Sequence, residues 1–366
     1  MKAVVLVGGE GTRLRPLTFT TPKPLLPIAG TPFLERQLRW LVSHGVEEVV
    51  LSLGYLPDAF VKHFPDGTFE GLRLHYAVED EPLGTAGAIR FAAEFAAISD
   101  RVIVCNGDVL TTLDLSAFVK FHLDRGAAAS IHLIEVEDPS AFGVVPTYPD
   151  GKVKAFVEKP PKGTAPTNLI NAGTYVLEPS VLERIPSQLS VSIEHETFPR
   201  LVEQEGTVYA LASDDYWIDI GTPEKYIAAH IDVNGGALGE RPTPAAQESD
   251  ASVWIESGAQ VAADAVLEGP SLIMRGATVE SGAHVVASTL GAGATVGDGA
   301  ALERAVLLDG ASVAPGAHVR ESIIGPDACV EQDAKVTDYS IVGAGARVQS
   351  GSTLAAGRVP VVAATG

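Results

Sequence analysis

The sequence predicts an α/β domain with a mainly parallel sheet, followed by a three-sided parallel β-helix. Three observations predict this architecture. Up to about residue 233, short β-branched runs alternate with longer amphipathic stretches, as in βα units around a parallel sheet. Residues 234–250 are rich in Gly, Pro and Ala and have no apolar period, as expected of a linker. Over residues 251–366 aliphatic residues recur at about every sixth position, which indicates stacked short strands.

The first domain, residues 1–233, contains the predicted sheet and its helices. Helical spacing predicts helices over Pro32–Ser43 and Thr85–Ala97, with Thr85 as an N-cap. A Rossmann-like sheet of this kind places ligands at the carboxyl ends of its strands. The predicted strands are Ala3–Val7, Glu48–Ser52, Arg73–Ala77, Val102–Asn106 and Ser130–Glu135.

From Ile273 the last domain also shows a longer period of 17 residues. Each 17-residue turn contributes three inward aliphatic side chains. Small and turn-forming residues lie between them, as corners require. Coils with an exposed end favour self-association, so we expect a homo-oligomer. The three aliphatic series are Ile273, Leu290, Leu307, Ile324 and Ile341; Val279, Val296, Val313 and Val330; and Val285, Leu302, Val319 and Val336.

Charge and composition exclude several classes of function. The chain has 46 acidic and 26 basic residues and a formal net charge of -20, which disfavours binding to nucleic acid or to anionic membranes. Cys105 and Cys329 have no disulfide or zinc spacing. The N-terminal apolar run reaches glycine too soon for a signal peptide, and no stretch approaches the roughly 18 apolar residues of a membrane span. We therefore expect a cytoplasmic protein that contacts neither membrane nor nucleic acid.

Three glycines end the first predicted strand and begin the most informative segment. Gly8, Gly9 and Gly11 let the backbone approach a ligand closely, and free amides in such a turn bind anions. Their spacing does not fit a dinucleotide fingerprint, because Leu14 stands at the third glycine position, and the Lys of a Walker P-loop is absent. The pattern favours a triphosphate cradle of another type.

Residues 10–32, here called the proline-rich loop, have the sequence EGTRLRPLTFTTPKPLLPIAGTP. Arg13 and Lys23 supply two cations, and the prolines reduce the conformational entropy lost on binding. The alternative interpretation is a surface connection with incidental basic residues. The complete string favours a pre-shaped, positively charged binding loop.

Seven further motifs follow in an order that resembles the sugar-phosphate nucleotidylyltransferase family. The string GGEGTRLRPLTFTTPKPLLP is similar to the signature of that family, and the whole set is most similar to GDP-mannose pyrophosphorylases. The C-terminal repeats resemble the hexapeptide-repeat family, which implies a left-handed β-helix. The other motifs are EDEPLGTAGA, NGDV, FGVV, FVEKP, NAGTYV, SIEHETFP and YWIDIGTPEKY.

The resemblance implies roles for individual residues of the catalytic domain, which spans residues 1–233. Asp108 and Asp219 would share a Mg²⁺ ion through oxygen ligands; alone, either is more often a turn or cap residue. Lys159 would neutralise the phosphate of a sugar 1-phosphate; the alternative is a solvated ion pair with Glu158. The expected catalytic set is Arg13, Lys23 and Lys159. The expected nucleotide site is Gly8, Gly9, Gly11, Thr12, Glu79, Gly84 and Asp108. The expected sugar-phosphate site is Gly143, Glu158, Lys159 and Asn171.

The expected reaction joins GTP to mannose 1-phosphate and releases GDP-mannose and pyrophosphate. A carboxylate such as Glu79 complements the ring NH and amino donors of guanine, and Gly84 leaves room for a flat base; Glu81 is an alternative to Glu79. Open alternatives are a glucose-1-phosphate uridylyl- or thymidylyltransferase, and a non-catalytic ligand-sensing homologue. A second, acyltransferase activity would use His284 and His318, which lie two predicted coils apart.

Overall fold

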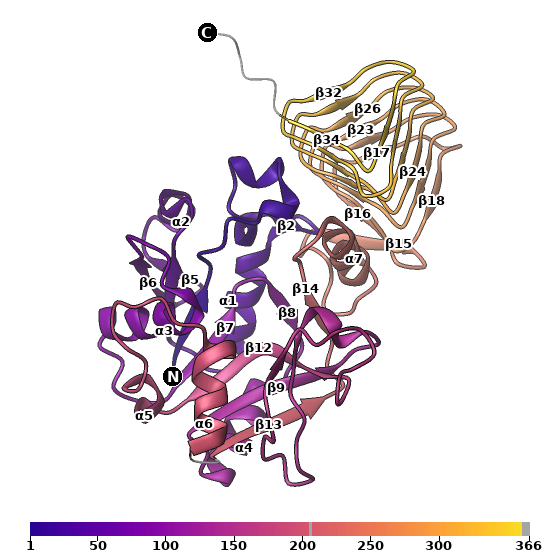
Figure 1. Cartoon of the computed structure of the whole chain (residues 1–366). Helices are drawn as coiled ribbons and strands as arrows, with labels where there is room; N and C mark the ends of the chain where they lie inside the picture. The colour runs from indigo at the N-terminus through magenta and orange to yellow at the C-terminus, as the bar shows by residue number, and fades with distance from the viewer. Residues whose placement is uncertain (205–206, 361–366) are drawn as a thin grey trace. The chain divides into compact units, whose positions relative to one another are not determined.

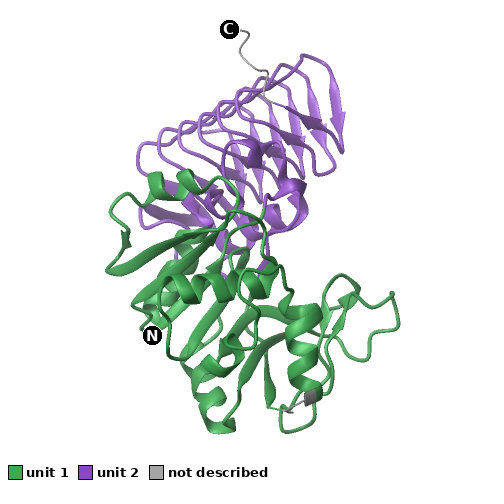
Figure 2. Ribbon diagram, turned by 60° about the vertical axis from the view of Figure 1, so that its left-hand side comes forward, with its two compact units in different colours: residues 1–9, 34–217 green, residues 10–33, 218–366 purple. Residues whose placement is uncertain are grey.

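The computed structural model describes residues 1–204 and 207–360. The chain forms two compact units (Figure 2), of which unit 1 comprises residues 1–9 and 34–217, and unit 2 comprises residues 10–33 and 218–366. The proline-rich loop thus belongs to the same unit as the C-terminal coils. The predicted domain boundaries at residues 233 and 251 stay a prediction.

Unit 1 is built on a ten-stranded mixed sheet with the order β11-β10-β12-β7-β1-β4-β6-β5, in which β9 pairs with β12 and β13. Strand β1 is parallel to both β4 and β7, and β4 is parallel to β6. The strands are β1 (Lys2–Leu6), β4 (Glu48–Leu53), β5 (Thr68–Phe69), β6 (Leu72–Val78), β7 (Val102–Asn106), β9 (Ala129–Glu135), β10 (Gly143–Val144), β11 (Val157–Glu158), β12 (Leu169–Leu177) and β13 (Val208–Ser213). All five strands predicted from the sequence are present.

Helices cover this sheet and bury its β-branched residues (Figure 1). Helix α3 packs on β1 and β4, and α4 packs on β9 and β13. Val4, Val50 and Val104 at the centre are fully buried, as expected when both faces of a parallel sheet are covered. None of the described helices combines the length and the apolar composition that a membrane crossing needs. The helices are α1 (Phe33–Ser43), α2 (Pro57–His63), α3 (Gly84–Phe95), α4 (Leu115–Arg125), α5 (Pro179–Leu182) and α6 (Phe198–Gln204), with a π-helix at Ile193–Thr197 and a 3₁₀ turn at Pro139–Ala141.

The prediction that Thr85 caps helix α3 is wrong. The N-cap is Leu83, and no side chain caps this helix. The Thr85 hydroxyl instead donates to Glu194 Oε2 (2.7 Å) and accepts the backbone N–H of Ile193 (2.8 Å). A tertiary contact therefore takes the hydroxyl that would otherwise have capped the helix.

Unit 2 contains three parallel sheets that form the faces of a β-helix (Figure 1). Among the described strands of these three sheets, β15 alone runs antiparallel to its neighbour, β16, at the start of the stack. The first face is β15 (Ala246–Asp250), β16 (Val253–Glu256), β19 (Ser271–Ile273), β22 (Thr289–Leu290), β25 (Val306–Leu307), β28 (Ile323–Ile324), β31 (Ile341–Val342) and β34 (Arg358–Val359). The second is β17 (Gln260–Val261), β20 (Thr278–Val279), β23 (Thr295–Val296), β26 (Ser312–Val313), β29 (Cys329–Val330) and β32 (Arg347–Val348). The third is β18 (Val266–Glu268), β21 (His284–Val286), β24 (Ala301–Glu303), β27 (His318–Arg320), β30 (Lys335–Thr337) and β33 (Thr353–Ala355).

The predicted columns of aliphatic residues form the core of this β-helix, with one correction. Ile273, Leu290, Leu307 and Ile324 lie in register, but the next member is Val342 and not Ile341. The reason is one extra residue at a corner. Preceding coils turn there through a single residue of positive φ, such as Glu321, whereas Asp338 and Tyr339 both adopt φ of 58°. Ile341 is buried but pairs with Ile323 in the neighbouring column.

The remaining elements of the chain are short, apart from one helix. Helix α7 (Pro223–Asn234) belongs to unit 2, as do the hairpin strands β2 (Pro27–Ile28) and β3 (Thr31–Pro32). The proline-rich loop also contains 3₁₀ turns at Thr12–Leu14, Leu17–Phe19 and Lys23–Leu25. The last two strands are β8 (Val109–Thr111) and β14 (Trp217–Asp219).

Candidate active site

Four neighbouring parallel strands of unit 1 end at one edge of the sheet, and predicted site residues follow three of them. Gly8 and Gly9 come after β1, Glu79 after β6 and Asp108 after β7. Register fixes this arrangement, because Leu6 pairs with both Ser52 of β4 and Asn106 of β7. The carboxyl edge of a parallel sheet is where ligands bind in such folds. The sheet therefore brings the predicted nucleotide-site residues of unit 1 to a single edge.

Glu79 is anchored at this edge by hydrogen bonds to both of its carboxylate oxygens. Ser52 Oγ donates to Oε1 (2.8 Å), and the backbone N–H of Leu83 donates to Oε2 (3.0 Å). A side chain at Gly8 would place its Cβ 3.9 Å from Oε1, so the glycine turn and the carboxylate are neighbours. A carboxylate has about four lone-pair sites, so these bonds orient Glu79 and leave acceptor capacity for a ligand.

Position 84 requires glycine because of its backbone conformation and a close backbone neighbour, and there is no open space beside it. Its φ is +67°, and a Cβ there would lie 2.7 Å from the carbonyl oxygen of Val191. Both facts exclude a side chain. The segment before the π-helix therefore packs closely on the start of α3, where Thr85 bonds Glu194 and Ile193. The proposed contact of Gly84 with a base stays a prediction.

Three of the predicted sugar-phosphate residues lie together on a short antiparallel pair. Gly143 of β10 pairs with Glu158 of β11, and a Cβ at Gly143 would come within 2.7 Å of Glu158 Oε2. Lys159 follows directly, with Nζ 3.1 Å from Glu158 Oε1 and 65% of its side chain exposed. Its φ of 45° is uncommon outside glycine, and such strain tends to persist at functional sites.

Asn171 lies on β12 beside an irregularity in the strand pairing. Its Nδ2 donates to the hydroxyl of Tyr175 (2.8 Å), and its Oδ1 accepts the N–H of Gly173 (3.0 Å). Burial raises the pKa of Tyr175 well above its usual value, with the charges of Glu194 and Glu158 adding to the effect. The Tyr175 hydroxyl is therefore neutral and can hold Asn171 in a fixed orientation.

In unit 2 the proline-rich loop holds its two predicted cations on a tight turn. Gly11 has φ of +61°, and a Cβ there would lie 3.1 Å from Cβ of Lys23 and 3.0 Å from Cγ2 of Thr18. Thr18 Oγ1 donates to the carbonyl of Gly11 (3.0 Å). Thr12 and Arg13 follow on the first 3₁₀ turn, and both are exposed. The loop thus places Lys23 beside Gly11 and presents Arg13 to solvent.

Asp219 and Arg13 meet at Gly221. A Cβ at Gly221 would lie 2.8 Å from Asp219 Oδ1 and 2.9 Å from Arg13 Nη2. The N–H of Gly221 donates to Asp219 Oδ1 (3.0 Å), and Lys225 Nζ forms an ion pair with Oδ2. The Asp219 side chain is 18% exposed. The carboxylate therefore lies in a cationic setting, next to a guanidinium and bonded to an ammonium.

A buried histidine anchors the proline-rich loop. The N–H of Ala29 donates to His230 Nδ1 (3.2 Å), so Nε2 carries the proton and donates to the carbonyl of Pro27 (3.1 Å). The Tyr226 hydroxyl donates to the same carbonyl (2.5 Å). Both His230 and Tyr226 lie on α7, which is joined to the coils by the hydrogen bond from Asn234 Nδ2 to Thr289 Oγ1 (3.0 Å).

The hairpin at the end of the loop also contacts the coils directly. Ala29 and Gly30 both have positive φ, as a two-residue hairpin turn requires. A Cβ at Gly30 would lie 2.5 Å from Cε of Met274, so the turn is in close contact with the first face of the β-helix. The β-helix therefore supports the proline-rich loop.

The donor chemistry of Asp108 and Asp219 fits a magnesium ion, which prefers carboxylate oxygens together with substrate phosphates. Among the described residues no three His, Cys, Asp or Glu side chains gather as a complete metal cage. Magnesium bound through one or two carboxylates and phosphate needs no such cage. Asp108 belongs to unit 1 and Asp219 to unit 2, so their sharing of one ion stays a prediction.

Sequence reasoning missed three residues of this region. Lys225, the ion-pair partner of Asp219, and Glu194, the partner of Thr85, both lie within quoted motifs but were assigned no role. The N-cap position of Thr222, which accepts from the N–H of Lys225 (3.3 Å), gave a local signal for the start of α7. Nothing local indicated the bonds of His230, whose loop partners are about 200 positions away.

His284 and His318 lie in one outward column of the third face, with Ala301 between them. Both are exposed. The two cysteines are free, and burial raises the pKa of Cys105 to about 12. The Cys105 thiol is therefore protonated at neutral pH and is a poor nucleophile.

Comparison with known proteins identifies relatives of both parts of the chain. Residues 2–235 match the family described as Nucleotidyl transferase, and residues 267–361 match the family described as GMPPB C-terminal domain. A mannose-1-phosphate guanylyltransferase of Mycobacterium tuberculosis is 40% identical over 82% of this chain and 83% of its own length. Mannose-1-phosphate guanylyltransferase 1 of Arabidopsis thaliana is 41% identical over 62% of this chain and 63% of its own. The crystal structure of HddC from Yersinia pseudotuberculosis complexed with GMP-PN has a TM-score of 0.54 and 35% identity, and covers 63% of this chain and 97% of that one.

Proposed function

We propose that this chain, which belongs to the nucleotidyl transferase family, is a mannose-1-phosphate guanylyltransferase that converts GTP and mannose 1-phosphate to GDP-mannose and pyrophosphate. The observation that carries the reaction type is the row of strand ends that bears Gly8, Gly9, Glu79 and Asp108 at one sheet edge. The choice of mannose and guanine rests on the relatives, and the GMP-PN complex of a solved neighbour supports the base.

The reaction needs no protein nucleophile, because an oxygen of the sugar phosphate is already anionic. It attacks the α-phosphorus of GTP, one P–O bond forms, and the bond between the α-phosphorus and the bridging oxygen breaks as pyrophosphate leaves. Water is not consumed. Catalysis then consists of positioning and of neutralising charge, as in phosphoryl transfer generally. The protonated, buried thiol of Cys105 is consistent with this scheme.

The proline-rich loop would hold the triphosphate. Backbone amides at Gly8, Gly9 and Gly11 suit phosphate oxygens, with Thr12 as a further donor. Arg13 and Lys23 would stabilise the charge that builds on the departing pyrophosphate. The contact of Arg13 with Gly221 and the packing of Lys23 against Gly11 support this assignment, since preorganised cations lose little entropy when the ligand binds.

The sugar 1-phosphate would bind where β10, β11 and β12 meet. Lys159 would pair with its phosphate, while Glu158, Asn171 and the backbone at Gly143 would bind sugar hydroxyls. The fixed orientation of Asn171 on Tyr175 supports a positioning role. The exposed ammonium of Lys159 is within reach of an incoming anion.

Members of this family generally use a divalent metal ion. Asp108 and Asp219 would hold Mg²⁺, which would polarise the α-phosphate and offset its negative charge. Until the ion binds, the Lys225 ammonium keeps the Asp219 carboxylate compensated.

The proposal is tested by a matrix of five nucleoside triphosphates against several sugar 1-phosphates, with kcat/KM measured from pyrophosphate release. GTP with mannose 1-phosphate should give the highest value. A preference for UTP or dTTP with glucose 1-phosphate would replace it with the alternative nucleotidylyltransferases. Absence of turnover for every pair, with retained binding, would identify a ligand-sensing homologue.

We also propose that the chain forms a homo-oligomer through the end of the β-helix. Strands β34, β32 and β33 end their sheets and have a pairing neighbour on one side only among the described strands. Such edges favour association. Light scattering coupled to size exclusion would give a mass above 38.1 kDa for an oligomer, and a monomer mass would refute it.

A further inference from the structure

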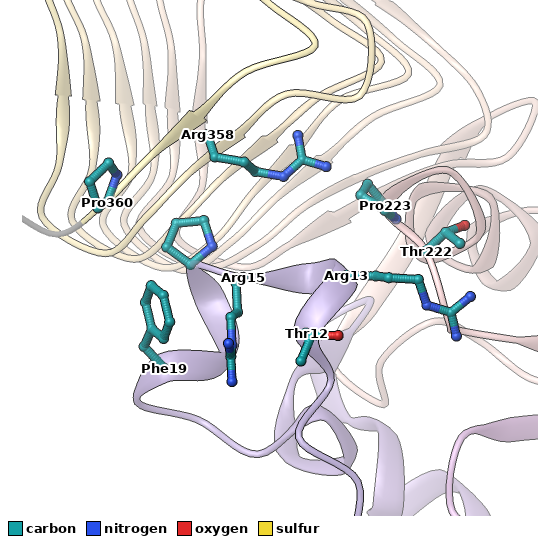
Figure 3. A pocket seen from close by; sticks show the side chains of 9 residues that line it. Thr12, Arg13, Arg15, Phe19, Thr222, Pro223, Arg358 and Pro360 are labelled. Carbon is teal, nitrogen blue, oxygen red and sulfur yellow. The ribbon is translucent and has the colours of Figure 1, made fainter.

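A pocket of about 690 Å³ lies within unit 2, between the proline-rich loop and the last coil (Figure 3). The loop contributes Thr12, Arg13, Arg15, Pro16 and Phe19. The start of helix α7 contributes Thr222 and Pro223, and the last coil contributes Arg358 and Pro360. This volume falls in the range of small-molecule sites, roughly 300 to 1,000 Å³. Thr12 and Arg13 were assigned above to the triphosphate, and the other seven lining residues have no assigned role.

The charged residues that line the pocket are all arginines. Arg13, Arg15 and Arg358 supply three guanidinium groups, and no carboxylate is among the lining residues. This differs from the rest of a chain whose net charge is -20. Guanidinium groups bind phosphate in a bidentate manner. The pocket therefore favours an anionic occupant.

Two of these arginines are held by neighbours, and each keeps donors that have no hydrogen-bond partner among the described residues. Arg358 Nη1 donates to the carbonyls of Tyr339 and Gly357 (both 3.0 Å), which fixes its guanidinium on the last coil. Arg15 Nη2 pairs with Glu10 (2.6 Å). Its Nε is buried and has no hydrogen-bond partner among the described residues.

The remaining wall is apolar and partly flat. Phe19 is 49% exposed and stacks under the Arg15 guanidinium at 5.3 Å from its ring centroid. Pro16, Pro223 and Pro360 complete this wall. A Cβ at Gly343 would lie 2.9 Å from Cγ of Pro16, so the loop and the coil are in close contact at this point. A planar ring that lies against Phe19 and the prolines would bury apolar surface on both partners.

We propose that this pocket is a second binding site, for a nucleoside monophosphate, with the base on the Phe19 and proline wall and the phosphate on Arg358. Arg358 does not belong to the proposed catalytic set. The first turn of α7 adds the positive end of a helix dipole at the same place. The base is held by apolar contact only, so the site accepts purines and pyrimidines alike.

An occupant would also affect turnover, an inference that rests on the proposed function. Thr12 and Arg13 line this pocket and belong to the loop that holds the triphosphate. A phosphate bound here draws Arg13 toward the pocket and away from the departing pyrophosphate. A bound nucleoside monophosphate should therefore lower kcat/KM for GTP.

The test is calorimetric titration of the full chain with AMP, UMP, CMP, GMP and inorganic phosphate. Arg358→Gln should raise the Kd of the monophosphates at least tenfold, and Phe19→Ala should raise it several-fold. Inorganic phosphate, which cannot use the wall, should bind at least tenfold more weakly than AMP. Arg347→Gln is the matched control, because Arg347 is another exposed arginine of the last coils and pairs with Glu331 outside the pocket.

The outcomes separate this site from the active site. Monophosphate binding that persists in Lys23→Ala but weakens in Arg358→Gln supports the proposal. The proposal is overturned if none of the monophosphates binds, or if Arg358→Gln and Arg347→Gln have the same effect. Binding is measured without turnover, so it can be interpreted even if the proposed reaction fails. Inhibition by AMP that Arg358→Gln abolishes would confirm the coupling, and AMP inhibition unchanged in that variant would refute it.

Discussion

The two units hold their candidate site residues in different ways. In unit 1, Gly8, Glu79 and Asp108 directly follow strands of one sheet, and ladder hydrogen bonds between neighbouring strands fix their positions. In unit 2, Arg13 and Lys23 lie on a loop with little regular structure. That loop is held by His230 and Tyr226 of α7 and by the contact of Gly30 with Met274.

This difference makes the β-helix the support of the proline-rich loop, which lies in the same unit. The strand ends would keep their geometry through local pairing alone, whereas the cationic loop depends on partners far away in sequence. Each hydrogen bond in such a network contributes about 1 kcal/mol, and a buried group left unpaired costs about 1 to 3 kcal/mol. Substitutions that remove stabilising contacts in the coils or in α7 should therefore alter phosphate binding. Comparable substitutions in unit 1, away from the strand ends, should not.

The largest expected effect is on turnover in Lys23→Ala. Loss of the one preorganised charge that we propose to face the departing pyrophosphate should lower kcat by about 10². Lys62→Ala, which removes an exposed lysine from α2, is the control and should leave kcat unchanged. A Lys23→Ala enzyme with near-normal turnover would remove the loop from the catalytic set.

A smaller effect is expected on magnesium dependence. Asp108→Asn and Asp219→Asn should each raise the Mg²⁺ concentration for half-maximal turnover about tenfold, equivalent to about 1.4 kcal/mol, because each would remove a proposed charged oxygen ligand. Asp58→Asn, at an exposed position of α2, serves as the control. A Mg²⁺ titration that is the same in all four proteins would contradict metal ligation by either aspartate.

His230→Ala tests the support of the loop directly. The change leaves the Ala29 N–H and the Pro27 carbonyl without their imidazole partner, so KM for GTP should rise about three- to tenfold, a range equivalent to about 1 kcal/mol. His122→Ala is the matched control in unit 1: His122 is equally buried, bonds Ser130 and Glu178, and lies toward the opposite edge of the sheet. Both variants should melt at lower temperature, but only His230→Ala should change KM.

Substitution of His132 on β9 should have the smallest effect on activity at neutral pH, and its effect should appear in the pH dependence of stability. Burial lowers its pKa from 6.5 to about 4, so the unfolded chain binds a proton that the folded one does not. Above pH 6.5 this difference does not lower the free energy of unfolding. As the pH falls toward 4 the unfolded chain takes up the proton, and the free energy of unfolding declines, by about 2 kcal/mol at pH 5. Urea unfolding at pH 7.5 and pH 5 should show a smaller decline for His132→Leu. Equal declines in the two proteins would contradict the assignment.

The sequence predicted elements well where the signal was local and periodic. The strand over Val102–Asn106 and the helix ending at Ser43 match the structure, because alternation and helical spacing extend over several residues. The columns from Val279 and Val285 were also correct for the same reason, and the column from Ile273 was correct as far as Ile324. The register error at Ile341 arose from one inserted residue, accommodated at Asp338 and Tyr339, which a fixed period does not detect.

Site residues were predictable by type but not by partner. Asp219 and Glu79 stood out within their motifs, yet the ion pair with Lys225 and the bonds to Ser52 and Leu83 follow from the fold. The misplaced N-cap at Thr85 has the same cause, since Glu194 competes for its hydroxyl from more than 100 positions away. Long-range hydrogen bonds of this kind leave no periodic trace in a sequence.

The most direct test of the account is a crystal structure of the full chain with GTP and Mg²⁺ bound. Arg13 and Lys23 should contact the β- and γ-phosphates, and carboxylate oxygens of Asp108 and Asp219 should lie about 2.0 to 2.1 Å from the metal. A triphosphate that leaves the proline-rich loop empty, or a metal ion that neither aspartate touches, would contradict it.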